Sequence, residues 1–272
     1  MKIAIQGIAG SFHHQVALNV FGKQVEVLEY RTFEEVARSV AQSQSMVGVM
    51  AIENSIAGAI LPNYELLDRY GLYILDEYYL PISHNLMALP GQEISDLDIV
   101  RSHPMAILQC RKFFESYPQI SLVDDVDTAT VAKRIVEENL LGLGAIASLA
   151  AAEIYGLQVL AKDIQTVKNN YTRFILLVNA PHSPSVIPNK VSMKVTIRNE
   201  KGSLAQLLAL LSTYDMDLTK IQSVPDLGKA WDYSFFIDAK FEDYSRYQRA
   251  IEAVSAQLGT IKIFGEYVNG NP

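Results

Sequence analysis

The sequence has little of several features that define common classes of protein. Its 272 residues include one cysteine, Cys110, which excludes an internal disulfide and a zinc site built from several cysteines. It has no cluster of Lys and Arg, and its formal net charge is −7, so we expect neither nucleic acid nor an anionic membrane surface as a partner. No apolar run approaches the ~20 residues of a membrane span, and the strand-like start Lys2–Gln6 has no signal-peptide pattern. We therefore expect a soluble, cytoplasmic protein.

Alternating strand and helix patterns fill the first two thirds of the chain and predict a two-lobed α/β domain over residues 1–180. Lobe one is expected to take about residues 1–80 and 162–180, and lobe two about residues 81–161. Pro81 marks the crossing into lobe two, and Asp163–Asn170 marks the return. Two lobes joined by two crossings indicate a hinged pair with a cleft between them.

A proline-containing stretch, Ala180–Asn189, reads as a linker to a second domain over residues 189–272. The order predicted beyond it is strand, helix, strand, strand, helix, strand, with the fourth of these elements at Trp231–Ala239. This βαββαβ order is that of a ferredoxin-like fold.

Polar residues follow two of the predicted strands in lobe one. The loop Gly7–His13 lies between a strand and a helix, an arrangement that directs backbone N–H groups and the positive end of a helix dipole at an anion, with Ser11 within the loop. Glu53, Asn54 and Ser55 follow the buried strand Met46–Ile52. They fit either a cap for the next helix or the polar wall of a cleft.

A third polar cluster opens a predicted helix in lobe two. Ser102 and Gln109 are two helical turns apart and would share one face of the helix, where they would grip a polar ligand. His103 and Cys110 have the same spacing, but a lone cysteine inside an amphipathic helix is more often a core residue than a nucleophile.

The fourth cluster is Asn170–Phe174, just before the apolar run Ile175–Val178. It places the hydroxyl of Thr172 and the guanidinium of Arg173 at the mouth of a strand, where open α/β sheets bind ligands. A turn with an ordinary surface arginine is the other interpretation.

Taken together, these segments resemble the prephenate dehydratase family, in the family's order and over essentially the whole chain. The resemblance rests on Gly7–His13, Ile52–Gly58, Ser102–Cys110 and Asn170–Phe174, and in the C-terminal part on Gly202–Ala205 and Gln222–Pro225. The loop departs from the family pattern at Ile8, Ala9 and His13, which puts side-chain contacts from this loop in doubt. The C-terminal part departs from it at Gln222 and Val224, so a charged pair of the regulatory site is missing.

The resemblance implies a periplasmic-binding-protein-like catalytic domain followed by an ACT regulatory domain. The implied reaction converts prephenate to phenylpyruvate with loss of water and CO₂, and its chemistry requires no redox cofactor or metal. Thr172 would donate a hydrogen bond to the leaving hydroxyl, with Glu53 as the alternative proton source if it is buried. Arg173 would bind a carboxylate or else brace the cleft. The residues implied to orient the substrate are Ser11, Asn54, Ser55, Ser102 and Gln109.

The ACT resemblance also implies regulation by L-phenylalanine. The amino acid would bind where two such domains meet, near Gly202, Ser203, Leu204 and Ala205 of one subunit and Gln222 and Ser223 of another. This arrangement implies a homodimer or homotetramer with feedback inhibition.

Three other functions remain open at this level. An arogenate dehydratase would act on a substrate with an amino group in place of the keto group. A two-lobed amino-acid-binding sensor would bind without turnover. A hydrolase with a Ser or Cys nucleophile is a more distant alternative.

Overall fold

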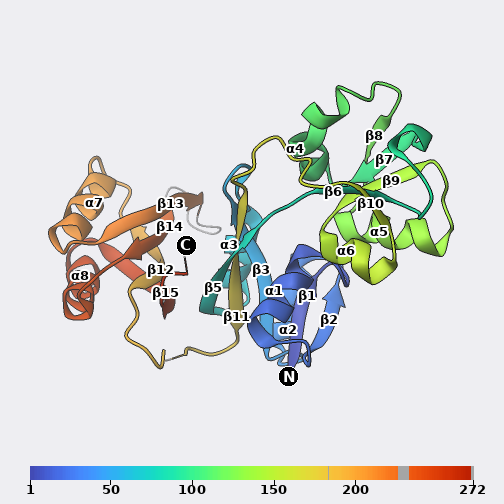
Figure 1. Ribbon diagram of the computed structural model, residues 1–272. Helices are drawn as coiled ribbons and strands as arrows, with labels where there is room; N and C mark the ends of the chain where they lie inside the picture. Colours follow the sequence, from blue (N-terminus) through green and yellow to red (C-terminus); the bar gives the residue numbers. More distant parts are fainter. Residues whose placement is uncertain (183, 226–232, 271–272) are drawn as a thin grey trace.

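Two α/β lobes and a C-terminal α/β unit make up the computed structural model, which describes residues 1–182, 184–225 and 233–270 (Figure 1). Each of the three parts has its own β-sheet. In Figure 1 lobe one lies in the middle, with lobe two on one side and the C-terminal unit on the other. No helix in the described ranges is long and apolar enough to cross a membrane.

Lobe one is built on a six-stranded sheet whose main path has the order β2-β1-β3-β11-β5. The strands β1, β2 and β3 pair in parallel, whereas β11 is antiparallel to both β3 and β5. Its elements are β1 (Lys2–Gln6), α1 (Phe12–Phe21), β2 (Glu26–Tyr30), α2 (Phe33–Ala41), β3 (Val47–Asn54), β4 (Gly58–Ala59), α3 (Leu61–Arg69), β5 (Tyr73–Pro81) and β11 (Tyr171–Val178). A segment from far along the chain therefore fills the middle of this sheet.

Lobe two has a five-stranded sheet of order β10-β6-β9-β7-β8. Its elements are β6 (Asn85–Ala88), a 3₁₀ turn at Ile94–Asp96, β7 (Ile99–Ser102), α4 (Pro104–Phe114), β8 (Ser121–Asp124), α5 (Thr128–Glu137), β9 (Leu143–Ala147), α6 (Leu149–Tyr155) and β10 (Gln158–Ala161). The chain enters between β5 and β6 and leaves between β10 and β11. The predicted two-lobed α/β arrangement is thus confirmed.

The C-terminal unit has the predicted βαββαβ order, with sheet order β13-β14-β12-β15. Its elements are β12 (Lys190–Ile197), α7 (Ser203–Thr213), β13 (Asp217–Pro225), β14 (Tyr233–Lys240), α8 (Tyr244–Gln257) and β15 (Gly259–Tyr267). The first two residues of the strand predicted at Trp231–Ala239 lie outside the described residues.

Both faces of the C-terminal sheet are covered. The helices α7 and α8 pack on one face, where Leu207 and Val254 lie in one apolar cluster. The other face packs on lobe one, where Phe236 and Phe264 join Leu67 and Ile74 in a shared core. Because burial of large apolar side chains is the main favourable term in folding, this shared core joins the C-terminal unit to lobe one.

The glycine loop of lobe one contacts α6 of lobe two. Ser148 Oγ donates a hydrogen bond of 2.7 Å to the carbonyl oxygen of Gly10, and the hydroxyl of Tyr155 donates one of 2.8 Å to that of Ala9. Gly10 has φ +85°, and a Cβ built on it would lie 2.8 Å from the Cα of Ala151. Only glycine allows this approach of the two lobes.

We predict that Gly10→Ala destabilises the protein more than Gly22→Ala. Gly22 has nearly the same φ, +84°, but a Cβ added to it would have no neighbour within 4 Å. Both variants carry the backbone cost of alanine at a positive φ, about 1–3 kcal/mol. Gly10→Ala adds a clash with α6, for a further loss of about 1–3 kcal/mol. Urea unfolding of both variants measures the difference, and equal losses would contradict a tight contact between the loop and α6.

Candidate active site

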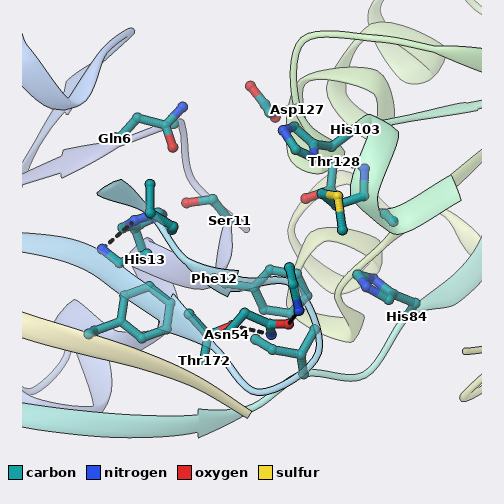
Figure 2. A pocket seen from close by; sticks show the side chains of 18 of the residues that line it. Gln6, Ser11, Phe12, His13, Asn54, His84, His103, Asp127, Thr128 and Thr172 are labelled. Atoms are coloured by element: carbon teal, nitrogen blue, oxygen red, sulfur yellow. Dashed lines mark hydrogen bonds between the residues drawn. The ribbon is translucent and has the colours of Figure 1, made fainter. Parts of the chain in front are cut away.

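A cavity of about 390 Å³ lies between the two lobes, lined by residues from both (Figure 2). Its polar lining includes Gln6, Ser11, His13, Asn54 and Thr172 from lobe one and His103, Gln109, Asp127 and Thr128 from lobe two, with His84 at the crossing. Its apolar lining includes Phe12, Phe33, Ala51, Ile60, Ile82, Met105 and Phe174. The described lining residues include no Lys or Arg. The cavity thus combines largely apolar walls with polar groups at a few points.

The floor of the cavity is formed by paired residues of β3 and β11. Asn54 and Thr172 are directly opposite each other in the antiparallel ladder. Asn54 Nδ2 donates to Thr172 Oγ1 at 3.0 Å, while Asn54 Oδ1 accepts the backbone N–H groups of Ile56 and Ala57 at 3.0 and 2.9 Å. These two backbone donors fix the orientation of the amide, so the hydroxyl oxygen of Thr172 is an acceptor in this pair. Its hydrogen is therefore free to point at a molecule in the cavity.

Side-chain hydrogen bonds continue from this pair into lobe two. Asn54 Nδ2 also donates to Asn170 Oδ1 at 2.7 Å, and Asn170 Nδ2 donates to Gln109 Oε1 at 2.9 Å. Gln109 Oε1 lies 3.0 Å from Nε2 of His84. Since Gln109 Oε1 only accepts, His84 donates from Nε2. A continuous chain thus joins Thr172 to His84 across the lobes.

His84 lines the cavity but has a buried ring nitrogen without a partner. The residue is 4% exposed, and its Nδ1 has no hydrogen-bond partner among the described residues. Burial lowers the pKa of His84 to about 4, so the ring is neutral at pH 7 and Nδ1 carries a lone pair. A buried acceptor without a partner costs free energy of folding. Sequence reasoning missed this residue; a lone histidine beside the Pro81 crossing was the available signal.

His13 lies on the opposite wall and is used within the protein. Its Nε2 accepts the backbone N–H of Ala51 at 3.3 Å, and its ring packs edge-on against Phe174 with centroids 4.9 Å apart. Burial lowers its pKa to about 3. His13 is therefore a neutral histidine that holds α1 against β3.

The N-termini of α1, α4 and α5 all face the cavity. Ser11 caps α1 by accepting the N–H of His14, His103 caps α4 by accepting that of Met105, and Asp127 caps α5 by accepting that of Thr130. Helix N-termini carry partial positive charge and spare N–H donors. Converging helix ends can therefore bind anionic groups without a basic side chain.

Comparison with known proteins identifies the family of this chain. A profile of the prephenate dehydratase family matches residues 3–182. The chain belongs to the prephenate dehydratase family. An Arabidopsis thaliana protein, arogenate dehydratase/prephenate dehydratase 1, is 34% identical over 98% of this chain and 72% of its own length. A bifunctional chorismate mutase/prephenate dehydratase of Aquifex aeolicus is 30% identical over 98% of this chain and 73% of its own length.

Two solved structures share the whole fold. A prephenate dehydratase from Arthrobacter aurescens in complex with L-Phe aligns with a TM-score of 0.90 at 26% identity, covering 99% of this chain and 90% of its own. A structure described as a novel type of quorum-quenching acylase aligns with a TM-score of 0.89 at 26% identity, covering 98% of both chains.

Within the family fold, two residues predicted to act on the substrate face away from the cavity. Arg173 and Glu53 are opposite each other in the ladder, next to Thr172 and Asn54. Side chains of adjacent strand residues point to opposite faces, so Arg173 is directed at the C-terminal unit, where it is buried against Asp238. Glu53 is half-exposed and paired with Lys220 at 3.1 Å. The prediction that Arg173 binds a substrate carboxylate is corrected, and Glu53 is not the buried acid that proton donation requires.

Two predicted serine contacts also lie outside the cavity. Ser102 is fully buried on β7 and donates a hydrogen bond of 2.6 Å to the carbonyl oxygen of Ile146. Ser55 is exposed and accepts the N–H of Tyr171 at 2.9 Å, which ties the end of β3 to the start of β11. Both serines have structural partners. Of the predicted substrate-binding residues, the structure brings Ser11, Asn54 and Gln109 to the cavity, together with the predicted catalytic residue Thr172.

The predicted regulatory residues lie in the C-terminal unit. Gly202 is the N-cap of α7, with a left-handed φ of +88°, and Ser203, Leu204 and Ala205 form the first turn of that helix. Gln222 and Ser223 lie on β13, which is an edge strand of the sheet. No group of three or more His, Cys, Asp or Glu side chains within the described ranges is arranged to hold a metal.

We predict that His13 and His84 make folding stability depend on pH below about 6.5. An unfolded histidine binds a proton near pH 6.5, whereas these two stay neutral in the folded state down to about pH 3 and 4. Stability is therefore complete above pH 6.5 and falls as pH drops, by up to about 1.4 kcal/mol per pH unit for each histidine.

Urea unfolding between pH 4 and 8 tests this dependence. His84→Gln and His13→Gln each reduce the slope below pH 6.5, while His182→Gln, at an exposed position, leaves it unchanged. Identical slopes in all three variants would refute the assignment.

Proposed function

We propose that this chain is a prephenate dehydratase that converts prephenate to phenylpyruvate, CO₂ and hydroxide. The observation that carries the proposal is the pair Asn54–Thr172 on the cavity floor, with the hydroxyl hydrogen of Thr172 free. In this reaction the C–C bond to the ring carboxylate breaks, its electrons make the ring aromatic, and the ring hydroxyl departs. Atoms and charge balance without a cofactor, because the dianion gives one monoanion, CO₂ and hydroxide.

Thr172 would stabilise the oxygen that leaves. A threonine hydroxyl is too weak an acid to release a proton, but it can donate a hydrogen bond to the developing hydroxide. Asn54 holds the Thr172 oxygen as an acceptor, which aims its hydrogen away from the amide. Asp127 is occupied as a cap, accepting both the N–H and the hydroxyl of Thr130 at 2.7 and 2.6 Å. Solvent therefore protonates the hydroxide after it departs.

The substrate carboxylates would be bound by helix N-termini, not by cations. Ser11 and His103 cap the N-termini of α1 and α4, which face the cavity from the two lobes. Gln109 and Asn170 would orient the substrate through the hydrogen-bond chain. The apolar wall, which includes Phe12 and Phe174, would keep the ring carboxylate poorly hydrated, which favours loss of CO₂.

Arogenate is the second candidate substrate, and its ammonium group would require an acceptor. The carboxylate among the described lining residues, Asp127, is already used as a helix cap. This arrangement supports prephenate over arogenate.

A hydrolase lacks support at this site. Ser11 Oγ accepts the backbone N–H of His14, and among the described residues no histidine ring is hydrogen-bonded to it. Cys110 is fully buried, and burial raises its pKa to about 12, so it is not a thiolate at neutral pH. Neither residue therefore supports a hydrolase with a Ser or Cys nucleophile.

We further propose that the C-terminal unit is an ACT domain that binds L-phenylalanine between two copies of the chain. Leu204 and Leu208 on α7 and Ile221 on β13 are apolar side chains that are exposed in the single chain. An exposed edge strand beside apolar residues favours association. A homodimer or homotetramer would cover this surface. We also expect the reaction to take place in the cytoplasm.

We predict that Thr172→Val lowers kcat for phenylpyruvate formation about 100–1,000-fold, because it keeps the side-chain shape but removes the donor. Thr172→Ser keeps the hydroxyl and retains most of the rate. Ultraviolet absorption of phenylpyruvate measures both, without added cofactor. A wild type that is inert on prephenate but active on arogenate would identify the other substrate. Binding of prephenate by calorimetry without turnover of either compound would indicate a sensor.

We predict that Ile221→Lys reduces oligomer size and raises the phenylalanine concentration for half-inhibition at least about tenfold, since a charged edge residue opposes strand association. Val268→Lys is the matched control, because Val268 is equally exposed in the same unit but lies beyond β15. Sedimentation and inhibition assays measure the two effects. A wild type that sediments as a monomer, or unchanged inhibition in Ile221→Lys, would refute this arrangement.

A further inference from the structure

The C-terminal unit contacts the ends of β3 and β11 on the face of the sheet that is turned away from the cavity. The ladder places Thr172 opposite Asn54 and Arg173 opposite Glu53, and a register shift follows immediately. The first pair lines the cavity and the second contacts the C-terminal unit. Each residue of the floor is therefore joined by one peptide bond to a residue held by that unit.

Arg173 is held from both sides of the domain interface. Its Nε donates to Glu77 Oε2 of β5 at 2.7 Å. Its two terminal nitrogens bind the C-terminal unit, Nη2 donating to the hydroxyl of Tyr267 at 2.9 Å and Nη1 forming an ion pair with Asp238. Arg173 is only 4% exposed. A planar guanidinium with partners in three directions has one allowed position.

Further contacts hold these partners in place. Lys190 of β12 donates to both carboxylate oxygens of Glu77 at 2.8 Å, and Ser192 hydrogen-bonds both Asp238 and Tyr267. Burial would raise the pKa of Asp238, but Arg173 and Ser192 outweigh it and hold that pKa below its usual value. The network therefore keeps its charges buried and paired.

Glu53 makes the second link. Lys220 of β13 places its ammonium 3.1 Å from Glu53 and 5.0 Å from the ring centre of Tyr64. Lys220 is two residues before Gln222 on the same strand. The strand that carries the proposed phenylalanine contacts is thus ion-paired to the residue next to Asn54.

We propose that Arg173 and Glu53 are positioning residues through which the C-terminal unit sets the geometry of Thr172 and Asn54. The proposal rests on the proposed function of the cavity. A displacement of β13 or β14 would shift Glu53 or Arg173, and the adjacent floor residue would move with it. Such a movement would change the geometry of the 3.0 Å hydrogen bond between Asn54 and Thr172. Misplacement of catalytic groups by about 1 Å can cost about 100-fold in rate.

Through the same contacts, phenylalanine bound to the C-terminal unit would change the geometry of the cavity floor. A ligand that contacts Gln222 and Ser223 acts on β13, and Lys220 on that strand transmits the shift to Glu53. Coupling between two binding sites is reciprocal, so substrate in the cavity would change phenylalanine affinity by the same factor.

A comparison of Lys220→Met with Lys194→Met tests the proposal. Lys194 also crosses this interface, with its ammonium 2.7 Å from Asp68 of α3, but Asp68 is not next to a cavity residue. Both changes remove one interdomain ion pair and preserve side-chain length. We expect Lys220→Met to lower kcat about tenfold, to leave KM within about twofold and to weaken inhibition by phenylalanine. Lys194→Met leaves kcat and inhibition unchanged, and Lys220→Arg restores both.

These measurements distinguish a positioning role of the Lys220–Glu53 contact from a purely structural role. Urea unfolding of the two methionine variants shows whether they are equally folded, and a lower kcat in Lys220→Met alone supports positioning. Equal kcat values in an active pair overturn the positioning role and leave the activity in place. If Lys220→Met fails to fold, Lys220→Gln and Asp238→Asn serve in its place and are held to the same comparison. A wild type without turnover of prephenate or arogenate overturns the proposed function, and the positioning role with it.

Discussion

Neighbouring residues of a β-strand direct their side chains to opposite faces, and the rest of this structure depends on how β3 and β11 use that alternation. At the end of the ladder, Asn54 and Thr172 point into the cavity, while Glu53 and Arg173 point at the C-terminal unit. Two short polar segments thus line a cavity on one side and a domain interface on the other. A one-residue slip of this ladder would exchange the two faces. The register of β3 and β11 therefore decides which side chains reach the cavity and which reach the domain interface.

The interface between lobe one and the C-terminal unit contains apolar and ionic contacts, which contribute differently to it. Phe236 and Phe264 bury apolar surface against lobe one, which supplies most of the attraction. The buried ions add less net stability, because each loses several kcal/mol of hydration that its partner must offset. Removing one partner, however, leaves an uncompensated charge at a cost of about 3–5 kcal/mol. We infer that the apolar contacts hold the domains together and that the ions around Arg173 fix their exact placement.

The sequence predicted the architecture and part of the site. Strand and helix periodicity was sufficient for the two lobes and the C-terminal βαββαβ order, and polar residues after β3 and before β11 indicated the cavity floor. The errors arose where one motif spans two faces or two elements. Arg173 follows Thr172 directly, so the alternation of side chains along a strand places the two on opposite faces of the sheet. The prediction placed both of them at the ligand. Ser102 lies on β7 and not in the helix that contains Gln109, so helical spacing did not relate them. His84 has no motif, and its role depends on contacts with Gln109 that only the fold creates.

The lining of the cavity bears on how a decarboxylating site should bind a dianion. A lysine or arginine beside the ring carboxylate would stabilise the substrate more than the departing neutral CO₂, which would oppose the reaction. The described lining residues contain neither, and Arg173, the basic residue nearest in sequence to Thr172, is neutralised by Asp238 and Glu77. Helix N-termini offer a weaker and fixed positive potential. Such a site can hold a dianion and still favour the loss of one of its charges as CO₂. In the proposed mechanism the burial of Arg173 therefore has two effects, because it removes a cation from the cavity and fixes the strand that carries Thr172.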